Sequence, residues 1–159
     1  MSVVTAINQA QDSKNQSIDM LSVSIGGRCF LLERDAVKSC QSIKGIDTAE
    51  PARKSVGWMA FDHGRYPVYS MTTDLDLIDE IDENRKLCLV MPEASCAILC
   101  DEIKPQQIDS MIIHKLPECM MLDSTPVEAY AINSGVDSLD HTIILSSSRL
   151  KQFINRFAR

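Results

Sequence analysis

Residues 56–71, Val-Gly-Trp-Met-Ala-Phe-Asp-His-Gly-Arg-Tyr-Pro-Val-Tyr-Ser-Met, contain two apolar runs separated by Asp-His-Gly. This composition predicts two strands joined by a tight turn. Gly64 suits the turn because it adopts a positive φ without the steric cost of a Cβ atom. Pro67 has no N–H to donate, so the second strand is expected at a sheet edge, a strand start or a bulge. Trp58, the only tryptophan, and Phe61 concentrate scarce aromatic bulk here. The hairpin is therefore expected to form core.

The same pattern of short apolar runs and turn residues continues along the chain. Residues 20–25 and 28–32 predict two strands around a Gly-Gly turn. Residues 87–91 are an unbroken apolar run, and residues 95–100 are apolar after Ser95; both runs predict strands buried on both faces. We also expect strands at 108–116, 127–133 and 142–145, a short helix or irregular strand at 34–40, and a loop at 45–54. With so little helix, the sequence predicts an all-β barrel or sandwich.

The C-terminal residues predict one short helix. Apolar side chains recur at the spacing i, i+3, i+4 and i+7, which places them on one helical face. These residues are Leu150, Phe153, Ile154 and Phe157. One of the serines at 146–148 is expected to cap the helix by accepting a hydrogen bond from a free N–H.

Length and charge restrict the class of protein. The chain has 159 residues and a formal net charge of −6, which disfavours binding to nucleic acid or to an anionic membrane surface. It has no apolar run of the ~18–20 residues needed to span a bilayer, so no membrane insertion is expected. The first ten residues lack a signal-peptide pattern, and the cytoplasm is the expected location. Polar residues dominate 1–17, which predicts a flexible tail before a single domain at 18–159.

The order of residues from Gly57 to Pro67 resembles the central signature of the CheW-like domain family. The signature is a glycine, an apolar strand, a turn, and a proline within a second apolar strand. Gly57, Gly64 and Pro67 are the structural part of this motif. The chain departs from the family at two places. Asp62-His63 stands where the family has Arg-Gly, and Ser70-Met71 stands where it has Asp-Leu.

The resemblance, which extends from Met20 to Phe157, implies both a fold and a role. The implied fold is two small five-stranded β-barrels around a shared core, with a short C-terminal helix. CheW-like proteins are adaptors that couple chemoreceptors to a histidine kinase. The resemblance therefore implies a non-catalytic adaptor in chemotaxis-type signal transduction, serving swimming or type IV pilus motility. The implied partners are the kinase regulatory domain and the signalling tip of a chemoreceptor.

The resemblance also implies which residues bind these partners. The candidate contact residues are Phe61, Asp62, His63 and Arg65. An arginine at the turn would present a fork of hydrogen-bond donors, and neither Asp62 nor His63 reproduces that geometry. Arg65, two residues beyond His63, is the candidate to replace it.

The other chemically active side chains predict no catalytic or metal site. The six cysteines form no Cys-x-x-Cys pair and are expected to be small buried hydrophobes. Cys96 and Cys100 should share one strand face with Ile98 rather than bind zinc. These six residues are Cys29, Cys40, Cys88, Cys96, Cys100 and Cys119.

The histidines and the acidic stretch support the same view. His63 is expected at a turn tip, His114 in a strand and His141 in a loop, with no nucleophile motif or phosphate-binding loop nearby. We therefore expect neither an enzyme nor a cofactor. Residues 72–83 are acidic but lack the glycine of a calcium loop at its sixth position. They predict a solvated connector or short helix in which Leu75, Ile78 and Ile81 face inward.

Three functional hypotheses remain open at this point. The first is the chemosensory adaptor just described. The second is a divergent CheW-like interaction module that has lost receptor binding and docks another signalling partner. The third is a small-ligand β-barrel, for which the sequence offers no convergent set of polar residues.

Overall fold

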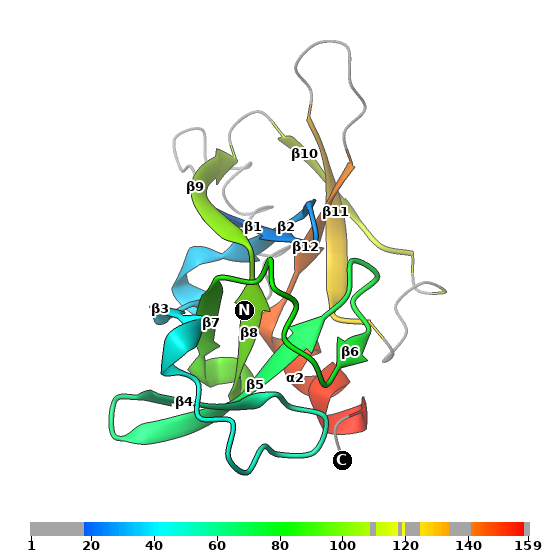
Figure 1. Cartoon of the computed structure of the whole chain (residues 1–159). Coiled ribbons are helices and arrows are strands. Elements are labelled where there is room, and N and C mark those ends of the chain that lie inside the picture. The colour runs from blue at the N-terminus through cyan, green and yellow to red at the C-terminus, as the bar shows by residue number, and fades with distance from the viewer. Residues whose placement is uncertain (1–17, 109–110, 118, 120–124, 134–140, 158–159) are drawn as a thin grey trace.

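The described part of the protein consists of two curled β-sheets and one C-terminal helix, as seen in the computed structural model (Figure 1). The structure describes residues 18–108, 111–117, 119, 125–133 and 141–157. The predicted tail at 1–17 lies outside these residues. The predicted all-β class with a short terminal helix is confirmed.

The first sheet contains six strands in the order β10-β11-β12-β2-β1-β9. Its strands are β1 (Ile18–Ile25), β2 (Arg28–Glu33), β9 (Glu102–Ile108), β10 (Met111–Lys115), β11 (Val127–Asn133) and β12 (His141–Leu145). All neighbours pair antiparallel except β12 and β2, which are parallel. The predicted Gly-Gly turn joins β1 to β2, with φ of +61° at Gly26 and +84° at Gly27.

The second sheet has the order β3-β7-β8-β5-β4, and the short strand β6 pairs with β5. Its strands are β3 (Ser39–Ser42), β4 (Gly57–Phe61), β5 (Gly64–Met71), β6 (Leu77–Ile78), β7 (Leu87–Met91) and β8 (Cys96–Cys100). The sheet curls until its two ends meet. Gln41 of β3 donates a hydrogen bond from Nε2 to the carbonyl of Ala60 in β4, at 3.2 Å. The first sheet thus has six strands and the second has five plus β6, where five each were expected.

Short 3₁₀ helices connect several strands. They are η1 (Arg34–Ala36), η2 (Ile43–Gly45) and η3 (Pro92–Ala94). The segment 34–40 therefore contains both a helical turn and the start of β3, the two alternatives that its sequence predicts.

One strand of the first sheet differs from the sequence prediction. Residues 102–108 form β9, although only the segment from Ile108 was expected to be a strand. The sequence pattern does not predict this strand, because its polar residues and Pro105 give no apolar alternation. The strand forms by pairing with β1, and its place at the end of the strand order tolerates the missing N–H of Pro105.

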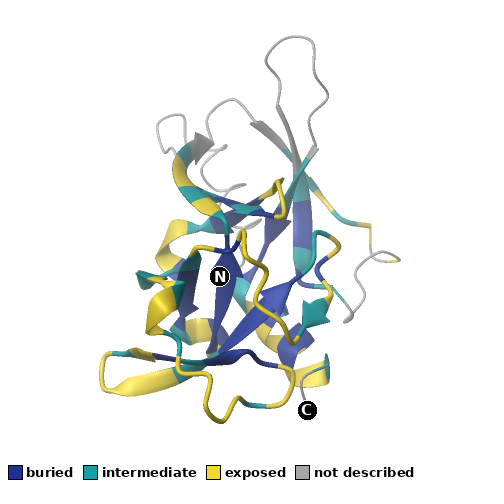
Figure 2. Ribbon diagram, in the orientation of Figure 1, coloured by how far each residue is buried: buried dark blue, intermediate teal, exposed yellow. Residues whose placement is uncertain are grey.

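The second sheet contributes to two cores, one on each face. On β8, Cys96, Ile98 and Cys100 pack into a large core shared with the first sheet and the helix. Ala97 and Leu99 point the other way, into a smaller core with residues of β4 and β5. Figure 2 shows the resulting buried centre. Because both faces are covered, the unbroken apolar runs of β7 and β8 were correctly predicted to be buried strands.

The C-terminal helix α2 (Ser147–Phe157) closes the large core. Ser146 caps it, because its Oγ accepts a hydrogen bond from the N–H of Arg149 at 3.2 Å. Leu150, Phe153 and Ile154 are buried, and Phe157 packs partly against them. The predicted apolar stripe and serine cap are confirmed.

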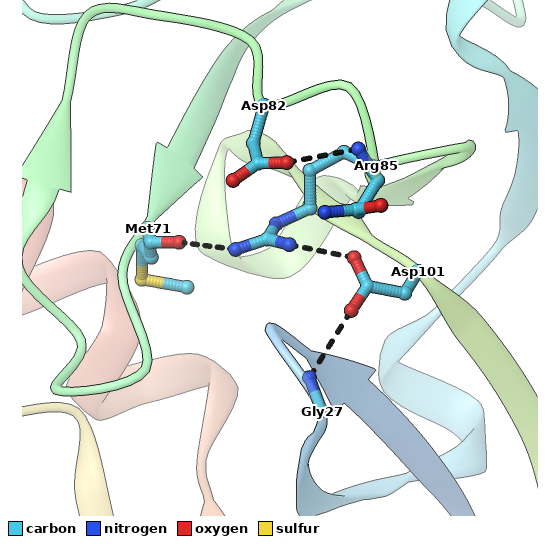
Figure 3. A network of polar contacts seen from close by, with 6 residues as sticks. Gly27, Met71, Asp82, Arg85 and Asp101 are labelled. Atoms are coloured by element: carbon cyan, nitrogen blue, oxygen red, sulfur yellow. Dashed lines mark hydrogen bonds and ion pairs between the residues drawn. The ribbon is translucent and has the colours of Figure 1, made fainter.

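A buried arginine links the two sheets (Figure 3). Arg85, only 3% exposed, donates from Nη1 to Asp101 Oδ1 at 2.6 Å and from Nη2 to the carbonyl of Met71 at 3.2 Å. The second oxygen of Asp101 accepts from the N–H of Gly27, in the β1–β2 turn. One ion pair thereby connects the ends of β5 and β8 in the second sheet to a turn of the first. No feature of the sequence analysis singled out Arg85.

We expect Arg85→Ala to lower the free energy of unfolding by about 3–5 kcal/mol, because it leaves the carboxylate of Asp101 partly buried without a counter-ion. Urea unfolding measures this loss. The matched control is Arg34→Ala, because Arg34 is exposed and lies 3.9 Å from Asp19. That control should cost less than about 1 kcal/mol. Equal losses in the two variants would contradict a structural role for the buried pair.

Gly57, the first residue of β4, is expected to tolerate no side chain. It has a φ of +156°, and a Cβ atom there would lie 2.5 Å from the carbonyl oxygen of Asp47. Gly57→Ala should therefore cost roughly 2–4 kcal/mol. Gly64→Ala in the same hairpin is the control, since its Cβ would lie 3.6 Å from the nearest atom and should change stability by less than about 0.5 kcal/mol. Thermal unfolding of both variants checks the difference.

Three of the six cysteines are buried as predicted, and the other three are exposed. Burial raises the pKa of Cys88, Cys96 and Cys100 from 9.0 to about 12. Above pH 9 these thiols lose protons in the unfolded chain but keep them in the folded one. The free energy of unfolding should therefore fall as the pH rises from 9 to 12. The exposed thiols are Cys29, Cys40 and Cys119.

Urea unfolding at several pH values tests this prediction, with Cys96→Ala as the variant whose pH dependence should be shallower in that range. Iodoacetamide at pH 8 gives a second readout. It should modify the three exposed thiols in the folded protein and the buried three only after unfolding. Equal rates for all six would contradict the burial of the thiols.

Candidate functional site

The β4–β5 hairpin carries all the predicted contact residues. Its two-residue turn is Asp62-His63, with φ of +46° and +66°. Positive φ at both central residues is what a tight hairpin turn of type I′ requires, and Asp and His tolerate it better than most residues. The prediction that Gly64 adopts the positive φ is wrong. Gly64 is the first residue of β5 and pairs with Phe61.

The two faces of the hairpin have different environments. Met59 and Val68 are buried in the smaller core, and Phe61 and Tyr66 pack partly against it. The opposite face carries Trp58, Ala60, Arg65 and Pro67, which we call the outer face. The hairpin forms core as predicted, but through Met59 and Val68. Trp58 is only half-buried on the outer face, because alternation along β4 separates it from Met59 and tertiary packing covers the face that carries Met59.

Trp58 and Arg65 form a stacked pair on the outer face. The guanidinium carbon of Arg65 lies 4.2 Å from the centre of the Trp58 ring. The indole Nε1–H donates to the carbonyl of Glu50 at 2.7 Å, which fixes the ring. Such a cation–π contact at an exposed site contributes about 0.5–1 kcal/mol. Within the described part of the chain, Arg65 makes no ion pair.

The backbone explains how β5 accommodates Pro67. Trp58, its partner in β4, donates to and accepts from Asp47, at 2.8 and 2.9 Å. The backbone N–H and C=O of Trp58 therefore point away from β5. No hydrogen bond between β4 and β5 requires an N–H at position 67. Pairing of β5 with β8 begins only at Val68. The sequence predicts a sheet edge, a strand start or a bulge for this strand. As a whole β5 lies between β4 and β8, but residues 64–67, at its start, pair with β4 alone.

The four candidate contact residues do not form one surface. Asp62 and His63 are exposed at the tip, and Figure 2 shows this end of the hairpin as exposed. Arg65 is exposed on the outer face, whereas Phe61 lies half-buried on the inner face. The sequence reasoning missed Trp58 as a surface residue. Its position opposite Pro67, on the same face as Arg65, follows from the pairing of the two strands.

The two residues at the end of β5 that depart from the family pattern are buried here. Ser70 and Met71 are both fully buried. The hydroxyl of Ser70 has no hydrogen-bond partner. The side chain at this position, where the family resemblance implies an aspartate, therefore makes no hydrogen bond in the described structure.

Other polar residues lie apart from the hairpin or serve the fold. His114 of β10 stacks on Tyr130 of β11 with ring centroids 5.1 Å apart. His141 begins β12 and is not in the predicted loop. Among the residues that the structure describes, no group of three or more His, Cys, Asp or Glu could hold a metal ion.

The acidic connector lies mostly at the surface. Leu75 is buried and Ile78 is half-buried, as predicted. Ile81 is 38% exposed, so its predicted inward position is wrong. Asp74 and Asp76 both donate from their backbone N–H groups to the hydroxyl of Thr72, which shapes the start of the connector.

The comparisons with known proteins identify the fold. No protein-family model matches the sequence, and no curated protein does. The structure is similar to the crystal structure of the scaffolding protein TtCheW from Thermoanaerobacter tengcongensis. The two chains are 14% identical, and the match covers 82% of this chain and 89% of TtCheW with a TM-score of 0.57. The match in structure therefore gives the protein a CheW-like fold.

In the described parts of the chain, no helix has both the length and the apolar character to cross a membrane.

Proposed function

We propose that this protein is a non-catalytic adaptor in chemotaxis-type signalling, coupling chemoreceptors to a histidine kinase in the cytoplasm. The supporting observation is the CheW-like arrangement of both sheets and the helix, which matches a scaffolding protein over most of both chains. In this proposal, residues 18–159 act as one domain.

The described polar interactions fit a scaffold. The buried pair of Arg85 and Asp101 is used to join the two sheets. Ser146 is used to cap the helix. The stacked and exposed groups of the β4–β5 hairpin remain available to a partner. We assign the partner contacts to this hairpin, with Asp62, His63 and Arg65 at its surface and Phe61 supporting it from beneath.

One observation favours the second candidate, an interaction module that has lost receptor binding. The exposed tip presents the carboxylate of Asp62 and the imidazole of His63. Neither can donate the fork of hydrogen bonds that the family's arginine gives. A receptor surface adapted to that arginine would meet a carboxylate instead. In this candidate the protein still binds the histidine kinase or binds another signalling partner.

Calorimetric titration with the regulatory domain of a histidine kinase from the same genome tests the proposal. We expect a dissociation constant in the micromolar range, which corresponds to a binding free energy of ~−8 kcal/mol. Arg65→Gln and His63→Ala should weaken binding, because both remove exposed hairpin side chains. Arg34→Gln, remote in sequence and exposed, is the matched control and should leave the affinity unchanged. Phe61→Ala is less suitable because Phe61 packs against a core.

A second titration with a chemoreceptor signalling domain separates the two candidates. Binding to both proteins supports the coupling adaptor. Binding to the kinase domain alone supports the divergent module, and Asp62→Arg should then fail to restore receptor binding. Absence of binding to either partner, with an intact β-sheet circular dichroism spectrum, would overturn the proposed function and leave the fold unaffected.

A further inference from the structure

We propose that the outer face of the β4–β5 hairpin binds an acidic segment of a partner protein, with Arg65 as its carboxylate-binding residue. The inference rests on the proposed function in one respect, since it assigns a partner chemistry to the same hairpin. It differs in placing the recognition on the Trp58–Arg65 pair instead of the turn.

The stacking geometry leaves the donors of Arg65 available. A guanidinium that lies over an aromatic ring uses its flat face for the contact, and its N–H groups point outward in the plane of the fork. Arg65 is exposed, and no carboxylate of the described chain pairs with it. A carboxylate of another protein could therefore accept two parallel hydrogen bonds from it.

The platform beneath Arg65 is rigid. The indole of Trp58 is held by Glu50 through Nε1, at 2.7 Å. Its backbone is held by Asp47 through two hydrogen bonds of 2.8 and 2.9 Å. A side chain that is already ordered loses less conformational freedom when it binds. The stack thus presents Arg65 in a fixed position, unlike a freely rotating surface arginine.

The surroundings of the stack carry charges of both signs and some apolar surface. Arg53 and Lys54 follow Glu50 in the loop that holds Trp58, and both are exposed without an ion pair in the described chain. The carboxylates of Asp47, Glu50 and Asp62 are exposed in the same loop and at the turn. Ala60 and Pro67 add apolar surface on the hairpin face that carries Arg65. Carboxylate binding is therefore assigned to the donors of Arg65 itself, and its apolar neighbours favour a partner segment with an apolar side chain beside its carboxylate.

Nucleic acid fits this surface less well. Three cations are few for a phosphate backbone, whose binding grows with the number of neutralised phosphates. The chain as a whole is also negative, with 22 acidic against 16 basic residues. A protein segment that offers carboxylates next to apolar side chains matches the mixed chemistry of the outer face.

The single tryptophan makes the test direct, because Trp58 fluorescence reports on this face alone. The full chain is titrated with a synthetic peptide of three Glu-Leu-Glu-Ala repeats, and with the same peptide carrying Gln in place of Glu. We expect the Glu peptide to change the emission and the Gln peptide to leave it unchanged. Added salt should weaken the binding, since it screens exposed charges.

Variants then assign the effect to Arg65. Arg65→Gln should weaken binding of the Glu peptide roughly tenfold, and Arg65→Lys should give an intermediate loss because it keeps the charge but not the fork. Arg34→Gln should bind like the unchanged protein. Circular dichroism verifies that each variant is folded. Calorimetry replaces fluorescence for any variant in which loss of the stack alters the emission itself.

Several results would overturn the inference. These are unchanged binding in Arg65→Gln, equal binding of the Gln peptide, equal losses in Arg65→Gln and Arg34→Gln, or tighter binding of a short duplex DNA than of the Glu peptide. Kinase binding without peptide binding would overturn this inference and leave the proposed function standing. Binding of the Glu peptide without binding to the kinase or the receptor would overturn the proposed function and leave this inference standing.

Discussion

The ion pair between Arg85 and Asp101 is the interaction on which the relation between the two sheets depends. The backbone N–H of Asp101 donates to the carbonyl of Ser24 in the first sheet. Its carboxylate accepts from the N–H of Gly27 and from Arg85. Arg85 continues the connection to the carbonyl of Met71 in the second sheet. A buried charge is stable only when it is paired and hydrogen-bonded, so these contacts depend on one another. The link lies beside the shared core, which contains Met71 and Cys100 next to it in the chain.

The second sheet has both faces buried, and this explains the position of the candidate site. One face packs into the core shared with α2, and the other lines the smaller core. Strands β7 and β8 are therefore almost fully buried and offer nothing to a partner. The β4–β5 hairpin reaches solvent with its turn and outer face (Figure 2), and the end strand β3 is also partly exposed. Of these two, the hairpin carries the exposed Arg65 over Trp58, so we take it as the contact element.

The hairpin is part of a CheW-like fold, and its surface chemistry differs from what the family resemblance implies. The exposed groups of its turn are a carboxylate and an imidazole. The guanidinium lies on the outer face, over Trp58. In our proposal, an arginine on the outer face instead of at the turn changes what the hairpin recognises, while the adaptor architecture remains.

The sequence by itself determined the local elements of this protein. The Gly26-Gly27 hairpin, the runs of β7 and β8, and the capped helix at 147–157 depend on neighbouring residues, and local patterns predict them. Only the tertiary structure decided which hairpin face is covered, because alternation separates Trp58 from Met59 without saying which one meets the core. The same holds for β9, which exists through its pairing with β1, and for the burial of Arg85, whose partners are distant in the sequence. Contacts between remote segments set these outcomes, and a single sequence carries no direct record of such contacts.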